Sequence, residues 1–264
     1  MKKLHRALLA ATAILVLNSA SVLAADLNNG SIKDDGGYVP QTSSRPALFY
    51  VRGDFTASHN DFGSLSEAPN YNFFGAGIGN SRAWGGGLGM YFSPSVRGDL
   101  TVDWGNAASV SGSANNSLGS AQGQFGVKHL VGLANLYYDF DTRTRFTPYL
   151  GVGLGFARNT TTAGDGSAIC TACGSPPATA TIVTDGATKT NAAGALMAGF
   201  SAKLVDRVSF DAGYRFLYTG DARTSDMAVT YSPAAPSAPA TLPKMSVNDM
   251  YAHQFRVGLR VDLR

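Results

Sequence analysis

The strongest constraint on the fold is an alternation of apolar and polar side chains with a period of two residues. A period of two places successive side chains on opposite faces of a β-strand. Each run has roughly the 9–11 residues that a tilted strand needs to cross a bilayer. The sequence therefore predicts an all-β fold with eight main strands, near residues 48–57, 84–92, 97–104, 130–140, 146–156, 194–204, 208–216 and 254–263.

The lengths of the connecting segments predict the topology. Three segments are tight, near residues 93–96, 141–145 and 205–207, and four are long, at 58–83, 105–129, 157–193 and 217–253. Tight and long segments alternate, which is typical of an antiparallel up-and-down meander with all its tight turns at one end. We expect the long segments to be surface loops. The proline-rich stretch from Ser232 to Pro243 is expected to stay outside any sheet.

One face of these runs carries no charge and is rich in apolar side chains. A soluble barrel would bury such a face and a membrane barrel would turn it to lipid, so the alternation alone leaves both open. Aromatic residues gather at both ends of the runs, as with Phe49 and Phe146 at the tight-turn end and Trp84 and Trp104 at the other. Two aromatic bands are typical of the two membrane interfaces, which favours an eight-stranded transmembrane β-barrel.

The opposite face carries charges of both signs, which we expect to point into the barrel. Eight strands leave an interior that side chains can fill, and charges there are stable only when they are paired. The sequence therefore predicts a barrel closed by ion pairs. The expected lumenal residues are Arg52, Asp54, Arg97, Asp99, Asp103, Asp139, Lys203, Asp211, Arg215, Arg256 and Arg260.

The first 24 residues have the layout of a secretory signal peptide. Lys2, Lys3 and Arg6 precede an apolar stretch that is too short to span a bilayer as a helix, and small residues follow. We expect residues 25–46 to form a periplasmic leader and residues 47–264 to form the barrel. Without the three leading cations, 18 basic residues balance 18 acidic ones. This balance argues against binding nucleic acid through general basic charge.

Few residues suggest catalysis or metal binding. Cys170 and Cys173 could form a small disulfide, a redox pair or part of a metal site, and their Gly-, Thr- and Ala-rich surroundings favour the disulfide. His59, His129 and His253 lie at the ends of runs and are interpreted as surface imidazoles. We therefore predict no catalytic residue, metal or cofactor, and a protein that is not an enzyme.

Several motifs resemble a known family. The stretches 135–141 (NLYYDFD), 146–155 (FTPYLGVGLG), 213–216 (GYRF) and 255–260 (FRVGLR) resemble the small eight-stranded outer-membrane barrels of Gram-negative bacteria. These are the OmpA-like and opacity-protein-like surface antigens of the porin family. The resemblance implies a location in the outer membrane, contact with its lipid, and recognition of the C-terminal strand by the barrel-assembly machinery. Such barrels commonly end on an aromatic residue, whereas this chain ends Asp262-Leu263-Arg264.

The resemblance also implies a role. We expect a structural outer-membrane protein that supports envelope integrity and presents four long surface loops, with its interior closed by ion pairs. Two alternatives remain open at this point. One is a narrow porin-like channel for small solutes, and the other is a surface binder or adhesin whose loops contact a host molecule or another ligand.

Overall fold

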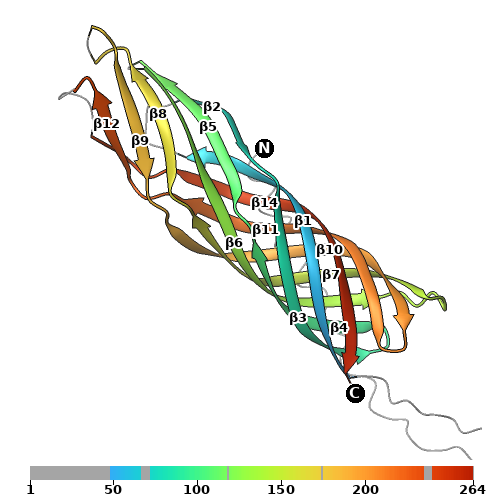
Figure 1. The fold of residues 1–264 in the computed structure, drawn as a ribbon. Helices are drawn as coiled ribbons and strands as arrows, with labels where there is room; N and C mark the ends of the chain where they lie inside the picture. Colours follow the sequence, from blue (N-terminus) through green and yellow to red (C-terminus); the bar gives the residue numbers. More distant parts are fainter. Residues whose placement is uncertain (1–47, 67–71, 118, 174, 235–239, 264) are drawn as a thin grey trace, which may run out of the picture. The chain divides into compact units, whose positions relative to one another are not determined.

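Antiparallel strands make up almost all of the described chain (Figure 1). The computed structural model describes residues 48–66, 72–117, 119–173, 175–234 and 240–263, and the predicted signal peptide and leader lie outside these ranges. Within them there is no helix long and apolar enough to cross a membrane. The strands are β1 (Phe49–Ser66), β2 (Asn72–Ile78), β3 (Ser81–Ser93), β4 (Val96–Gly105), β5 (Ala108–Asn116), β6 (Gly119–Asp139), β7 (Phe146–Thr161), β8 (Gly164–Cys170), β9 (Ala178–Thr184), β10 (Thr188–Val205), β11 (Val208–Arg223), β12 (Met227–Ser232), β13 (Thr241–Leu242) and β14 (Ser246–Leu263).

Eight of these strands form a closed ring. The hydrogen-bonded order runs β6-β4-β3-β1-β14-β11-β10-β7, and a further pairing of β6 with β7 returns to the start. Every pairing in the ring is antiparallel. A closed ring leaves no free strand edge, so its backbone amides and carbonyls pair within the wall. The predicted eight-stranded antiparallel barrel is confirmed.

The pairing register turns the apolar face outward. On β4, Leu100 is 68% exposed whereas its neighbour Thr101 is 2% exposed. Since the side chains of a strand alternate, one such pair fixes the orientation of the strand. Other large apolar side chains exposed on the wall include Trp84, Leu88, Val102, Trp104, Leu136, Leu150, Val152, Leu154, Phe156, Leu196, Phe255, Val257 and Leu259.

Three short turns join neighbouring wall strands at one end, as the sequence predicts. In the turn between β6 and β7, Asp141 Oδ1 accepts a hydrogen bond of 2.8 Å from Arg143 N, and Arg143 has a φ of 55°. An Asp side chain that bonds the backbone two residues later is a common means of closing a tight turn. The other two turns join β3 to β4 and β10 to β11.

The four segments expected to be loops are instead mostly strands, which is the main correction to the sequence analysis. Several wall strands continue far beyond the ring, and β6 bends past its end (Figure 1). There β6 pairs with β5 on one edge and with β8 on the other. Strand β5 then pairs with β2, and β8 is followed by β9, β12 and β13. We call this part the extension.

The extension also takes in part of the stretch expected to stay outside any sheet. Ser232 pairs with Thr179, and Thr241–Leu242 forms β13 against β12, so that expectation is wrong at both ends of the stretch. The sequence did not predict these strands because their apolar and polar side chains alternate only weakly. In Ala178–Thr184 small and β-branched residues alternate, and the inward set is buried although most of its members are small. Thr, Val and Ile favour strands even where little apolar area marks them.

Candidate functional site

The barrel interior holds a chain of ion pairs along its length, which we call the lumenal network. Near the short turns, Arg97 Nε lies 2.9 Å from Asp139 Oδ2. On the facing strands, Arg260 Nη1 lies 3.8 Å from Asp211 Oδ2, and Asp211 also accepts a hydrogen bond from Ser201. All of these side chains are buried. The lower part of the lumen is therefore crossed from two sides by charged groups.

Two aspartates link the arginines in the middle of the lumen. Arg52 lies 2.7 Å from Asp54 and 3.0 Å from Asp99. Asp54 is shared, because Arg256 Nη2 lies 3.0 Å from its other oxygen. Asp103 is shared as well, because Arg215 Nη1 lies 2.6 Å from its Oδ2 and Arg256 Nη2 lies 4.0 Å from its Oδ1. Each buried charge thus has a partner of opposite sign, which offsets the cost of removing it from water.

Tyrosines fill the space around these charges, and the sequence analysis did not select them. Tyr50 OH donates a hydrogen bond of 3.0 Å to Asp99, and the Arg97 guanidinium carbon lies 4.1 Å from the centre of the Tyr137 ring and 5.1 Å from that of Tyr149. Such cation–π contacts strengthen when water is excluded. The signal was present in the sequence, because these tyrosines stand at inward positions of the alternation.

Inward glycines make room for the tyrosine rings. A Cβ built on Gly89 would lie 2.1 Å from Tyr50 Cζ, and one on Gly151 would lie 2.6 Å from Tyr137 Cδ1. Neither ring could keep its place beside alanine. The glycines of the charged face therefore serve the packing of the interior.

All of the predicted lumenal residues except Lys203 are buried in the interior. Lys203 is exposed and lies beside the β-bulge between Lys203 and Val205, where β10 approaches its short turn. The pairing is regular up to Lys203 and shifts only after it, so Lys203 keeps the inward parity of Ser201 but lies at the end of the wall, where it is exposed to solvent. Assigning Lys203 to the lumenal network was wrong.

The interior is also partly apolar, which the sequence analysis missed. A buried cluster on β6, β7, β10 and β11 faces the lumen beside the charges. Its members are Val131, Leu133, Tyr137, Tyr149, Ala157, Ala193, Ala195, Met197 and Leu217. Charges and apolar side chains together leave the interior filled.

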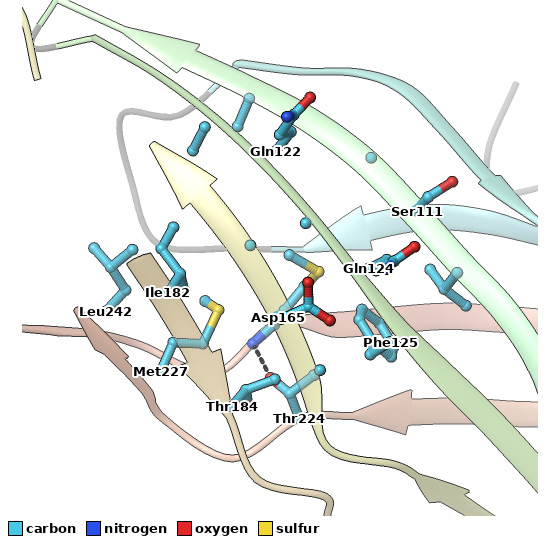
Figure 2. A pocket seen from close by; sticks show the side chains of 18 of the residues that line it. Ser111, Gln122, Gln124, Phe125, Asp165, Ile182, Thr184, Thr224, Met227 and Leu242 are labelled. Carbon is cyan, nitrogen blue, oxygen red and sulfur yellow. Dashed lines mark hydrogen bonds between the residues drawn. The ribbon is translucent and has the colours of Figure 1, made fainter. Parts of the chain in front are cut away.

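A second candidate site is an apolar cavity within the extension (Figure 2). Phe125 lies on one wall, and Ile182, Met227 and Leu242 lie on the other. The space measures about 840 Å³ including its open mouth. Ligand cavities are concave and mostly apolar, and most residues that line this space are apolar or glycine.

Small residues explain why this cavity stays open. Gly112, Ala114, Ala121 and Gly123 line it on β5 and β6, where larger side chains would fill the space. Below it, a buried cluster separates the cavity from the barrel interior. This cluster contains Val110, Phe125, Val127, Ala222, Val247 and Met250, of which Val110 and Phe125 line the cavity.

A model of the outer membrane protein beta-barrel domain family matches residues 10–261. The chain belongs to this family. Both the family membership and the outer-membrane location predicted from the sequence are thereby confirmed. In barrels of this class the short turns face the periplasm and the long segments face outward.

Curated relatives of similar length occur in Brucella. Uncharacterized proteins of Brucella abortus (strain 2308) and Brucella melitensis (biotype 1) are each 28% identical to this outer-membrane protein over 284 aligned positions, which cover 95% of either chain. Among solved structures, Neisserial surface protein A is 18% identical with a TM-score of 0.42, covering 81% of this chain and 97% of its own. OprG from Pseudomonas aeruginosa is 14% identical with a TM-score of 0.43, covering 83% and 97%.

The cysteines, His59 and His253 of this outer-membrane protein lie apart from both sites. Cys170 and Cys173 are joined by a disulfide at the end of β8. His59 is exposed and hydrogen-bonded to Asn80, and His253 stacks against Phe216 and Tyr251 on the outer wall. His129 is not a surface imidazole as expected, because it shares the inward face of β6 with the buried Val127 and Val131 and packs over Gly105. The described residues contain no cluster of His, Cys, Asp and Glu able to hold a metal ion.

Breaking the lumenal network should destabilise the barrel. Asp54→Asn removes the carboxylate that Arg52 and Arg256 share, leaving buried cations without their full complement of charge. We expect a loss of about 3–5 kcal/mol in the free energy of unfolding at pH 7. Urea titration of the protein refolded in lipid vesicles, followed by tryptophan fluorescence, measures this loss.

The matched control is Asp221→Asn in the partly exposed pair with Lys189, whose Nζ lies 2.6 Å from the Asp221 carboxylate. Burial acts to raise the pKa of Asp221, but hydrogen bonds from Lys189 and the Asp249 amide, with the ammonium charge, hold the pKa below its usual value. The pair is therefore intact at pH 7, and its contribution is lost only as the pH falls through that lowered pKa. Its loss should cost about 0–1 kcal/mol. Equal losses in the two variants would contradict a buried network.

Proposed function

We propose that this outer-membrane protein is a closed, non-catalytic barrel that supports the envelope and presents a β-structured extension at the cell surface. The observation that carries the proposal is the filled interior. Arg97, Arg52 and Arg215 are ion-paired at successive levels of the lumen, and each is buried. A solute would have to break these pairs, at a cost of several kcal/mol each, to pass through.

The extension supports the presenting role. Its strands are hydrogen-bonded to the barrel wall through β6, so surface side chains are held by a sheet rather than by loops. Sites built on strands are positioned more precisely than sites on loops. The outward positions of β5 and β6 are polar and uncharged there, with Ser109, Ser111, Gln122 and Gln124 exposed.

Planar-bilayer recording tests the closed state. Fluorescently labelled protein is counted in the same bilayer, so that a silent membrane is known to contain inserted barrels. We expect no steady conductance per inserted barrel, because the ion pairs and the cluster above them block the lumen. A steady conductance that scales with the number of barrels would favour the alternative of a narrow channel.

The cavity favours a second candidate function, the binding of a small apolar molecule at the surface. Its walls include Phe125 from the buried cluster described above. They also include Ile182, which belongs to a second buried apolar cluster with Ala180 and Val229. A hydrocarbon that enters would remove apolar surface from water on both sides, at about 25 cal/mol per Å². Most of the lining residues are apolar or glycine, and Asp165 is the one charged residue among them, which favours a ligand without charge.

A blocking variant tests this second candidate. A Cβ on Gly123 would meet no atom nearer than the Asp165 carbonyl oxygen at 3.5 Å, so Gly123→Phe can place a ring in the cavity. A diazirine-bearing decane is photolysed with the protein in nanodiscs, and the labelled residues are mapped by mass spectrometry. We expect labelling of the cavity residues in the native protein and its loss in Gly123→Phe.

Labelling of the lipid-facing wall gives the internal reference for partitioning of the probe. Gly77→Phe is the matched control, because a Cβ on Gly77 would meet nothing within 4 Å and the residues that line the cavity include none from β2. If the cavity residues are not labelled in the native protein, or stay labelled in Gly123→Phe, the cavity does not bind hydrocarbon.

A further inference from the structure

Basic side chains are distributed unevenly around the outside of the barrel. On the extension side, an aromatic band marks the upper edge of the lipid-facing wall, with Trp84, Trp104 and Phe156 each more than half exposed. Such bands lie at the level of the lipid headgroups. The next outward position along each strand, two residues further from the lipid, therefore lies at the headgroup phosphates or just above them.

Three neighbouring positions at this level are basic. Toward the extension, the outward position next to Trp84 on β3 is Arg82, and the one next to Leu130 on β6 is Lys128. The corresponding position next to Phe156 on β7 is Arg158. All three side chains are exposed. In the part of the chain that the structure describes, none of them belongs to an ion pair. We call these residues the basic band.

The register brings the basic band together. Arg158 pairs directly with Leu130, so it is a diagonal neighbour of Lys128 on the same face, about 7–8 Å away. Arg82 lies level with Asn106, whose amide donates to the Arg82 carbonyl, and β6 is the next strand beyond. Two strand spacings separate Arg82 from Lys128, about 10 Å. Long flexible side chains at these separations can reach a shared anionic group.

The surroundings match a phosphorylated saccharide. Above the basic band the outward side chains are hydroxyls and amides, which hydrogen-bond sugars without adding charge. The exposed ones include Ser109, Ser111, Gln122 and Gln124. The first carboxylate along this face, Asp165, pairs with Gln124, four residues or about 13 Å along β6 from Lys128.

The other wall strands carry fewer basic side chains at this level. There Tyr251 OH donates to Asp61 and Tyr218 OH donates to Asp249, so carboxylates and tyrosines lie beyond the aromatic band. At the matching positions on β1 and β14 stand Ala57 and His253. An anionic lipid would therefore meet attraction over β3, β4, β6 and β7 and less elsewhere.

We propose that the basic band binds the phosphate groups of an outer-leaflet glycolipid. Acyl chains would lie against the apolar wall, phosphates at Arg82, Lys128 and Arg158, and sugar against the hydroxyl and amide side chains above. Ionised donors make the stronger hydrogen bonds to phosphate, and arginine can bind it through two N–H groups at once. This site is independent of the closed lumen, and its three basic residues do not line the cavity, although Ser111, Gln122 and Gln124 do.

Retention of lipid A by the purified full-length protein tests the proposal. The detergent-solubilised protein is incubated with lipid A, passed through a size-exclusion column, and examined by native mass spectrometry. Each basic side chain near an anionic headgroup contributes roughly a factor of five in affinity. We therefore expect the triple variant Arg82→Gln, Lys128→Gln, Arg158→Gln to retain lipid A at least about tenfold less than the native protein.

The matched control removes three exposed arginines from the short turns, Arg143→Gln, Arg145→Gln and Arg207→Gln, with the same change in net charge. It should retain lipid A as the native protein does. Dephosphorylated lipid A should not be retained by the native protein, whereas retention through acyl chains alone would be unaffected by removing the phosphates.

Heat-dependent gel migration shows whether each variant is folded. If the triple variant does not fold, the single variant Lys128→Gln takes its place in the retention experiment. The proposal is overturned if the native protein retains dephosphorylated lipid A equally well. It is also overturned if the native protein retains no lipid A, or if basic-band and control variants lose retention to the same extent.

Discussion

Closure of the sheet by the pairing of β6 with β7 is the constraint on which the rest of the structure depends. In lipid an unpaired strand edge would leave backbone groups without hydrogen bonds, at several kcal/mol each. A closed ring of eight strands removes the edges but creates a narrow interior. Because side chains alternate, the apolar half meets lipid and the polar half must be accommodated inside.

That interior explains the unusual composition of the inward face. Charges are buried in matched pairs, tyrosine rings lie over glycines, and Leu133 and Met197 belong to the apolar cluster that fills part of the remaining space. Removing a single partner leaves a buried charge uncompensated, so the set is mutually dependent. The same filling that stabilises the barrel also closes it to solutes, which connects its stability with the function proposed for it.

The sequence was sufficient to predict the barrel, since a period of two is strong where large apolar residues alternate with charges, as at Leu100 and Asp99. It also located the lumenal arginines and aspartates. It missed the extension because strands such as β8 (GDGSAIC) and β9 (ATATIVT) carry mostly small residues on both faces, which gives little contrast between the faces. Lys203 was misplaced because the alternation gives the face of a residue but not its distance from the end of the barrel. The cavity depends on which distant strands pair with β6, which no local pattern records.

The central claim is that one face of each wall strand meets lipid while the other is packed inside, and spin-label accessibility tests it most directly. Single cysteines at positions 99 to 102 of β4 are labelled with nitroxide in vesicles, and their collisions with oxygen and with a polar nickel complex are measured. The account predicts high oxygen accessibility at 100 and 102, and low accessibility to both reagents at 99 and 101. Equal accessibility along the strand, or collisions with the nickel complex at 100 and 102, would contradict it.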